Sequence, residues 1–124
     1  MTRTFEDILA WQKAHQFVVD VYKTTESFPN FERYGLCSQF QRAAVSIAAN
    51  IAEGYKKLSK ADKLRFFNIS QGSLEECRYY CLLSRDLGYI DEEKFQELVQ
   101  IIVDASYMLN TYIKGLVNNN GILD

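Results

Sequence analysis

The chain has 124 residues, with 14 basic and 16 acidic side chains and a formal net charge of −2 at pH 7. This length suits one domain around a single core, and the acidic excess argues against a protein that coats nucleic acid by bulk charge. No apolar run approaches the roughly 18 residues of a membrane span, and the N-terminal residues lack the apolar segment of a signal peptide. We therefore expect a cytoplasmic protein with no membrane partner.

The first long helix is expected over residues 10–27, after a weak cap or turn that pairs Thr4 with Asp7. Pro29 stops this helix, because proline lacks an amide donor and disfavours helical backbone in the residue before it. Residues at helical spacing form its expected core stripe. They are Trp11, Ala14, Val18, Val21 and Tyr22.

The second helix, over residues 36–57, carries the clearest helical pattern of the chain. Spacings of three and four place its apolar residues on one face. They are Phe40, Ala43, Ile47, Ile51 and Gly54. Further alanines widen this face with short side chains, so other helices can come close to it. We expect this helix to be central to the fold.

The remaining arc of the second helix is polar, and two interpretations of it stay open. Its residues are Arg42, Ser46, Asn50 and Glu53, extended by Gln39 and Lys57. A solvated helix face explains such an arc. The alternative is a satisfied polar network that fixes the helix register or joins subunits, with Glu76 of the third helix as a candidate partner for Arg42.

The third helix is expected over residues 60–87, because Ser59 and Asp62 have the form of a capping box. It carries two apolar stripes, whereas an isolated four-helix bundle needs one per helix. The core stripe is Leu64, Phe67, Leu74, Cys77 and Cys81. The second stripe requires another cover, and we interpret it as a candidate oligomer interface. It consists of Phe66, Ile69, Tyr80, Leu83 and Leu87.

The fourth helix is expected over residues 91–117, with Gly88 ending the third helix and Asp91 as the N-cap. The tail, residues 118–124, contains an Asn-Asn-Asn-Gly breaker and is expected to fray. No stretch alternates with period two over strand length. Short connections between four helices predict an all-α, antiparallel up-down-up-down four-helix bundle that forms a single domain over residues 1–124.

Enzyme and metal chemistry have little support in the residues. The chain has three cysteines and one histidine, His15, whereas a structural zinc site needs four ligands. Phosphate-binding loops, metalloprotease motifs and serine nucleophile elbows are missing from the sequence. We expect no catalytic residue, no metal and no cofactor, and we read the cysteines as reduced core residues. A metal-binding or enzymatic four-helix bundle is the alternative.

Basic residues crowd the connection between the second and third helices, which we call the basic elbow. They are Lys56, Lys57, Lys60, Lys63 and Arg65. Such a cluster can neutralise phosphates, and the interleaved aromatic residues can stack on bases. The elbow is therefore a candidate nucleic-acid patch, and a solvated lysine-rich turn is the alternative.

Several segments resemble the four-helix-bundle proteins encoded in intervening sequences of bacterial 23S ribosomal RNA genes. The similarity covers nearly the whole chain in the same motif order. Its segments are Arg42 to Gly54, Trp-Gln-Lys-Ala-His from Trp11, Glu-Arg-Tyr-Gly-Leu from Glu32, Gly-Ser-Leu-x-Glu from Gly72 and Asp-Leu-Gly-Tyr-Ile from Asp86.

The resemblance implies a left-handed antiparallel bundle that assembles as a ring-shaped homopentamer, with no known catalytic residue or cofactor. A related branch, the accessory variability protein of diversity-generating retroelements, binds nucleic acid and a reverse transcriptase through a basic surface. This chain is mildly acidic, unlike that branch. By this resemblance we expect an oligomeric interaction protein whose partners are its own copies and RNA, single-stranded nucleic acid or a nucleic-acid-processing protein.

Overall fold

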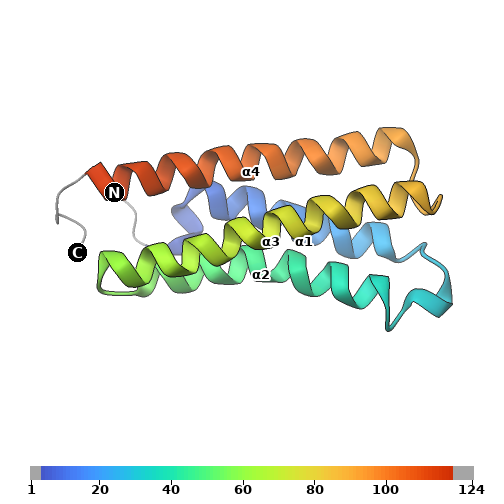
Figure 1. The fold of residues 1–124 in the computed structure, drawn as a ribbon, viewed down its shortest axis with the longest axis horizontal. Helices are drawn as coiled ribbons and strands as arrows, with labels where there is room; N and C mark the ends of the chain where they lie inside the picture. Colours follow the sequence, from blue (N-terminus) through green and yellow to red (C-terminus); the bar gives the residue numbers. More distant parts are fainter. Residues whose placement is uncertain (1–3, 119–124) are drawn as a thin grey trace.

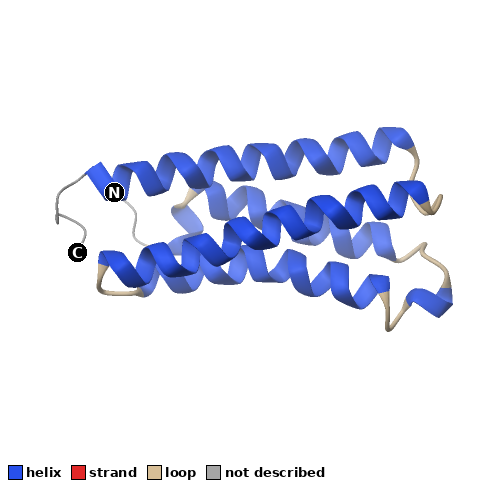
Figure 2. Cartoon of the chain, viewed as in Figure 1, coloured by secondary structure: helices blue, strands red, loops and turns tan. Residues whose placement is uncertain are grey.

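The computed structural model describes residues 4–118, and nearly all of them are helical (Figures 1 and 2). The long helices are α1 (Leu9–Thr25), α2 (Leu36–Lys56), α3 (Lys60–Asp86) and α4 (Glu92–Asn118), and single-turn helices η1 (Phe5–Asp7) and η2 (Asn30–Glu32) precede α1 and α2. Successive long helices run in opposite directions (Figure 1). The predicted all-α four-helix fold is confirmed.

The four long helices form a square in which each one packs against two others. Helix α2 contacts α1 and α3, and α4 contacts the same two helices from the other side. The largest fully buried side chains come from all four helices and include Phe17, Phe40, Phe67 and Leu98. The core therefore runs along the central axis of the bundle.

Helix α1 buries a different stripe from the predicted one. Phe17 is fully buried, whereas Tyr22, predicted in the core, is 46% exposed. Trp11 and Val18 lie at the edge of the core and are only partly buried. The buried stripe continues into Thr24 and Thr25. Thr24 and Thr25 belong to the buried face although they are polar. A prediction based on apolar residues alone therefore placed the core stripe on a neighbouring face of the helix.

Helix α1 also ends two residues before the predicted position. The Thr25 hydroxyl donates a hydrogen bond to the Val21 carbonyl (2.8 Å), and the Ser27 hydroxyl donates one to the Thr24 carbonyl (3.1 Å). Hydroxyl groups that bond the last carbonyls of a helix replace the amides of a further turn. The helix therefore stops at Thr25, before Pro29 can stop it.

Helices α2 and α3 approach closely at Gly54. A Cβ atom built on Gly54 would lie 2.6 Å from Cε1 of Phe67 and 3.1 Å from Cβ of Phe66. Farther along the same contact, the buried Ser70 hydroxyl donates a hydrogen bond to the Ile47 carbonyl (2.9 Å). Small residues on both helices thus set the short distance between them.

The end of α3 and the start of α4 lie at the predicted capping residues. Gly88 has a φ of 78°, the left-handed conformation that favours glycine after a helix. The Tyr89 amide donates to the Ser84 carbonyl (2.8 Å), and the Lys94 amide donates to the Asp91 carboxylate (2.8 Å). Helix α4 continues through Asn118, so the tail does not begin there. The rest of the predicted tail lies outside the described residues.

The predicted N-terminal caps differ in detail. Thr4 and Asp7 form a complete capping box, which caps η1 rather than α1. The Ser59 hydroxyl accepts a hydrogen bond from the Asp62 amide (3.2 Å), so Ser59 is the N-cap of α3. The Asp62 carboxylate turns toward the Arg65 guanidinium (3.5 Å), a cation of the basic elbow.

Candidate functional site

The basic elbow joins α2 to α3 at one end of the bundle. Its Phe66 ring contacts two cations, since Lys57 Nζ is 4.8 Å and the Arg65 guanidinium carbon 5.2 Å from the ring centroid. Phe67, the next residue, is fully buried in the core. Phe67 is therefore closed to base stacking and Phe66 already packs with cations, so the charged groups of the elbow suit a nucleic acid best, through its phosphates.

Lys63 belongs to the interior of the elbow. It is only 9% exposed, and its Nζ donates a hydrogen bond to the Tyr55 carbonyl (2.6 Å) near the end of α2. A cation at this position satisfies a carbonyl and interacts favourably with the negative end of the helix dipole. Lys63 therefore closes α2, and the surface patch reduces to Lys56, Lys57, Lys60 and Arg65.

Part of the polar arc on α2 forms a network with α3. The Asn50 amide donates to the Ser46 carbonyl (2.8 Å) and to the Ser46 hydroxyl (3.0 Å). Ser46 also receives a hydrogen bond from the hydroxyl of Ser73 on α3 (2.9 Å). Sequence reasoning missed Ser73. This network links the helices next to the close contact at Gly54.

The charged residues of the arc lie outside this network. Arg42 and Glu53 are exposed, and the ion pairs within residues 4–118 do not include Arg42. Glu76, its candidate partner, instead accepts a hydrogen bond from the Tyr80 hydroxyl (2.7 Å). Within one chain, Ser46 and Asn50 of the arc therefore belong to a polar network, whereas Arg42 and Glu53 form a solvated face.

The second stripe of α3 does not lie wholly on the surface. Tyr80 is 9% exposed. Its ring packs against Phe40 (5.7 Å between centroids) and its hydroxyl also bonds Gln39 (3.1 Å). The long side chain reaches the core from the flank of α3, so little of Tyr80 remains exposed to contact another copy. Ile69 (46%) and Leu87 (49%) are exposed, and Phe66 and Leu83 are half-buried.

The two cysteines of α3 are fully buried. Burial is the main cause that raises the pKa of Cys81 to about 12 and the pKa of Cys77 far above its usual value. Since the thiolate is the nucleophile and the metal ligand, both groups are held in their unreactive form at neutral pH. His15 stacks on the Trp11 ring (5.0 Å) and is exposed.

We expect the protein to lose stability at alkaline pH. Burial and the hydrogen bond to Glu76 raise the pKa of Tyr80 to about 12. Tyrosine and cysteine side chains of an unfolded chain release their protons near pH 10 and 8.5 respectively, so alkali favours the unfolded state. Urea denaturation should give full stability below about pH 8.5 and a progressive loss as the pH rises toward 12. An unchanged free energy of unfolding between pH 7 and 10.5 would contradict the buried positions.

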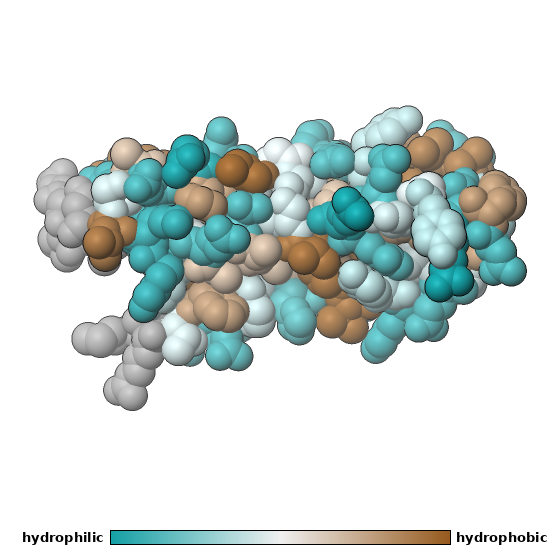
Figure 3. Space-filling model, turned by 90° about the horizontal axis from the view of Figure 1, so that it is seen from below, coloured by the Kyte–Doolittle hydropathy of each residue, from teal (hydrophilic) through white to brown (hydrophobic). Residues whose placement is uncertain are grey.

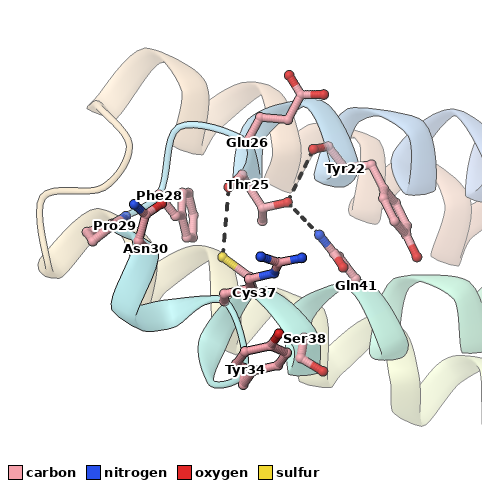
Figure 4. Close-up of a pocket in the computed structure, with 11 residues that line it drawn as sticks. Tyr22, Thr25, Glu26, Phe28, Pro29, Asn30, Tyr34, Cys37, Ser38 and Gln41 are labelled. Atoms are coloured by element: carbon pink, nitrogen blue, oxygen red, sulfur yellow. Dashed lines mark hydrogen bonds between the residues drawn. The ribbon is translucent and has the colours of Figure 1, made fainter.

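A pocket of about 540 Å³ lies where the end of α1 meets η2 and the start of α2 (Figure 4). The Thr25 hydroxyl accepts a hydrogen bond from the Gln41 amide (2.9 Å) in its wall, and the Cys37 thiol donates to the Thr25 carbonyl (3.8 Å). Tyr34 at its rim is 86% exposed. No pattern in the sequence pointed to this pocket.

Among the described residues, none of the helices is long and apolar enough to cross a membrane.

Comparison with known proteins identifies the family. The model of the 23S rRNA-intervening sequence protein family matches residues 6–111. The chain belongs to this family. Among solved structures, a crystal structure of a protein of unknown function from the S23 ribosomal protein family of Bacteroides thetaiotaomicron has 24% sequence identity and a TM-score of 0.79, covering 86% of this chain and 99% of that one. No curated protein matches the sequence.

In this member of the family, two segments that carried the resemblance meet at one carboxylate. Glu32 Oε1 accepts a hydrogen bond from the Leu36 amide (3.1 Å), at the first residue of α2. Its Oε2 accepts one from the hydroxyl of Tyr89 (2.8 Å), in the turn between α3 and α4. Glu32 therefore satisfies the amide at the first residue of α2, places a negative charge at the positive end of that helix, and ties the helix to a distant turn.

Proposed function

We propose that the protein is a non-enzymatic interaction protein that self-assembles and presents its basic elbow to single-stranded RNA. The observation that carries the RNA contact is the grouping of Lys56, Lys57, Lys60 and Arg65 around one rigid turn. Gly54 and Lys63 fix that turn, through the close contact with Phe67 and the hydrogen bond to the Tyr55 carbonyl. Because the chain belongs to the 23S rRNA-intervening sequence protein family, RNA is the partner that we would test first.

The number of cations per chain explains why assembly belongs to this proposal. A few lysines bind phosphates weakly at physiological salt, and the net charge of −2 opposes them. Copies of the same patch on one assembly raise the overall affinity without any new contact, provided that one RNA strand can reach several patches. The exposed apolar side chains of α3 support self-association, since a monomer would leave them in water.

Binding of a fluorescent single-stranded oligouridine tests the proposal. Measured by anisotropy, the affinity should fall roughly tenfold or more between 50 and 200 mM salt, because phosphate contacts release counterions. The triple change Lys56→Glu, Lys57→Glu and Lys60→Glu should abolish binding at 50 mM salt. The thermal melt should change little, since these side chains are not in the core.

A matched control is available at the opposite end of the bundle. The triple change Lys23→Glu, Arg33→Glu and Lys94→Glu alters the net charge by the same amount and should weaken binding far less. Equal losses for both triple variants would show that only bulk charge matters. Failure of the wild-type protein to bind at 50 mM salt would overturn the RNA role.

A further inference from the structure

The pocket beside η2, which we call the η2 pocket, has no role in the proposed function. Its volume of about 540 Å³ lies within the range of about 300 to 1,000 Å³ that is usual for small-molecule sites. It lies at the opposite end of the bundle from the basic elbow (Figure 1). Figure 3 shows hydrophilic and hydrophobic side chains mixed at this end of the molecule, on the right. The η2 pocket therefore suits a ligand that has both polar and apolar groups.

Gln41 presents a hydrogen-bond acceptor of fixed orientation at the η2 pocket. A hydroxyl group has one proton, and the Thr25 hydroxyl directs it at the carbonyls of Val21 (2.8 Å) and Tyr22 (3.2 Å) in its own helix. The Gln41 amide must therefore be the donor in its bond to the Thr25 oxygen (2.9 Å), drawn in Figure 4. This bond turns Nε2 of Gln41 toward α1, and Oε1 accepts no hydrogen bond within residues 4–118. A ligand that brings an N–H group to Oε1 gains a hydrogen bond there.

Arg33 gives the η2 pocket a cation. This arginine lines the pocket, is exposed, and forms no ion pair within residues 4–118. Two carboxylates of the same region leave it available. Glu26 points away from α2 (Figure 4), and Glu32 uses both of its oxygens in the hydrogen bonds described above. A guanidinium group suits a phosphate, to which it donates two parallel hydrogen bonds.

Two tyrosine rings border the η2 pocket. Tyr22 of α1 is 46% exposed and is directed toward α2 (Figure 4), and Tyr34, before α2, is 86% exposed. The Arg33 guanidinium lies 5.5 Å from the Tyr34 ring centroid. Most of this ring stays open even so, in contrast with the half-buried Phe66 of the basic elbow. Exposed aromatic rings of this kind stack on nucleic-acid bases.

We propose that the η2 pocket binds a single nucleotide. Arg33 binds the phosphate, a tyrosine ring stacks on the base, and Gln41 Oε1 accepts a hydrogen bond from an N–H group on the edge of the base. Every RNA base carries such a group, so the site recognises a nucleotide rather than one particular base. This inference does not rest on the proposed function, whose RNA contact uses the cations of the basic elbow at the other end of the bundle.

A free mononucleotide and the 5′-terminal nucleotide of an RNA strand present the same groups to the η2 pocket. Uridine 5′-monophosphate and a 5′-phosphorylated trinucleotide of uridine distinguish these two sources. Binding of both in the pocket would assign the strand end, and binding of the monophosphate alone would assign the free nucleotide. Failure of the monophosphate to bind would overturn the inference. An oligouridine that carries its dye on the 5′ end lacks the terminal phosphate, so the RNA test at the elbow stays separate.

A nuclear magnetic resonance titration of the wild-type protein locates the bound nucleotide. At physiological salt, uridine 5′-monophosphate should shift backbone amide signals within residues 22–41, which include the pocket lining. Uridine, which lacks the phosphate, and ribose 5-phosphate, which lacks the base, should each bind at least about tenfold more weakly. Equal affinities for the three compounds would overturn the inference, and so would shifts confined to the basic elbow.

Arg33→Gln tests the phosphate contact. It should weaken the binding of uridine 5′-monophosphate about tenfold and leave the binding of uridine unchanged, because only the phosphate loses its partner. Arg33→Lys keeps the charge and should lose less. Arg78→Gln is the matched control, since Arg78 is also exposed and forms no ion pair within residues 4–118. Equal losses for Arg33→Gln and Arg78→Gln would show that only net charge acts, which would overturn the inference.

Gln41→Met tests the base contact without a change of charge. It removes Oε1 and should weaken the binding of uridine 5′-monophosphate about fivefold. The binding of ribose 5-phosphate should stay unchanged, which a general distortion of the pocket would not allow. Equal losses for the two ligands would overturn the base contact. Because this variant also loses the bond to Thr25, a thermal melt checks that it is folded, and the Arg33 comparison decides if it is not.

Discussion

Replacing Gly54 by alanine is expected to lower the free energy of unfolding by about 2 kcal/mol or more. The new Cβ atom would lie 2.6 Å from the Phe67 ring, a distance at which one of the two must move. Phe67 is fully buried and its ring packs edge-on against Tyr112 at 5.6 Å, so it cannot turn away. Helix α3 must therefore shift from α2, which also strains the hydrogen bond between Ser70 and Ile47.

Urea denaturation at a fixed protein concentration measures this effect, because the proposed self-assembly would make stability depend on concentration. Gly115→Ala is the control, since a Cβ atom there would meet nothing within 4 Å. The control should raise stability by up to about 1 kcal/mol through helix propensity. If Gly54→Ala also raised stability, the close approach of α2 and α3 would be wrong.

Replacing Glu32 by alanine is expected to cost about 2 to 3 kcal/mol, although the residue lies outside the core. Two hydrogen bonds to one carboxylate are lost, to the Leu36 amide and to the Tyr89 hydroxyl. Hydrogen bonds to charged groups contribute about 1.5 to 3 kcal/mol, and the half-buried position of Glu32 keeps the combined loss near the upper part of that range rather than at twice it. The start of α2 and the turn after α3 should both loosen.

A double-mutant cycle separates the two contributions. Tyr89→Phe removes one hydrogen bond and leaves the bond between Glu32 and the Leu36 amide, so it should cost less than Glu32→Ala. Once Glu32 is alanine, the further change Tyr89→Phe should cost almost nothing, because its partner has gone. Independent, additive losses would show that the two side chains do not interact.

The number and ends of the helices were predictable because local chemistry sets them. Ser59, Gly88 and Asp91 act within one helical turn, so the sequence alone locates the ends of α3 and the start of α4. The early end of α1 was missed because the hydroxyls of Thr25 and Ser27 terminate it before the proline. Side-chain bonds of this kind compete with the helix and leave a weaker signal than proline.

The candidate sites were less predictable, because how far a long side chain is buried depends on the residues that neighbour it in the fold. Lys63 has the sequence pattern of a surface cation, but its hydrogen bond to the Tyr55 carbonyl holds it inside the elbow. Tyr80 looked like an interface residue, but Phe40 and Gln39 of α2 give it a place in the core. These neighbours lie on another helix, so no periodicity within α3 could reveal them.

The antiparallel order of four helices has a practical consequence for labelling. Helix α1 begins, α4 ends and the basic elbow turns at the same end of the bundle (Figure 1). A reporter protein fused beside Thr4 or Asn118 would therefore emerge next to the elbow cations and obstruct a bound strand. The turn around Gly88 lies at the opposite end, and a dye attached there through an engineered cysteine would leave the elbow open.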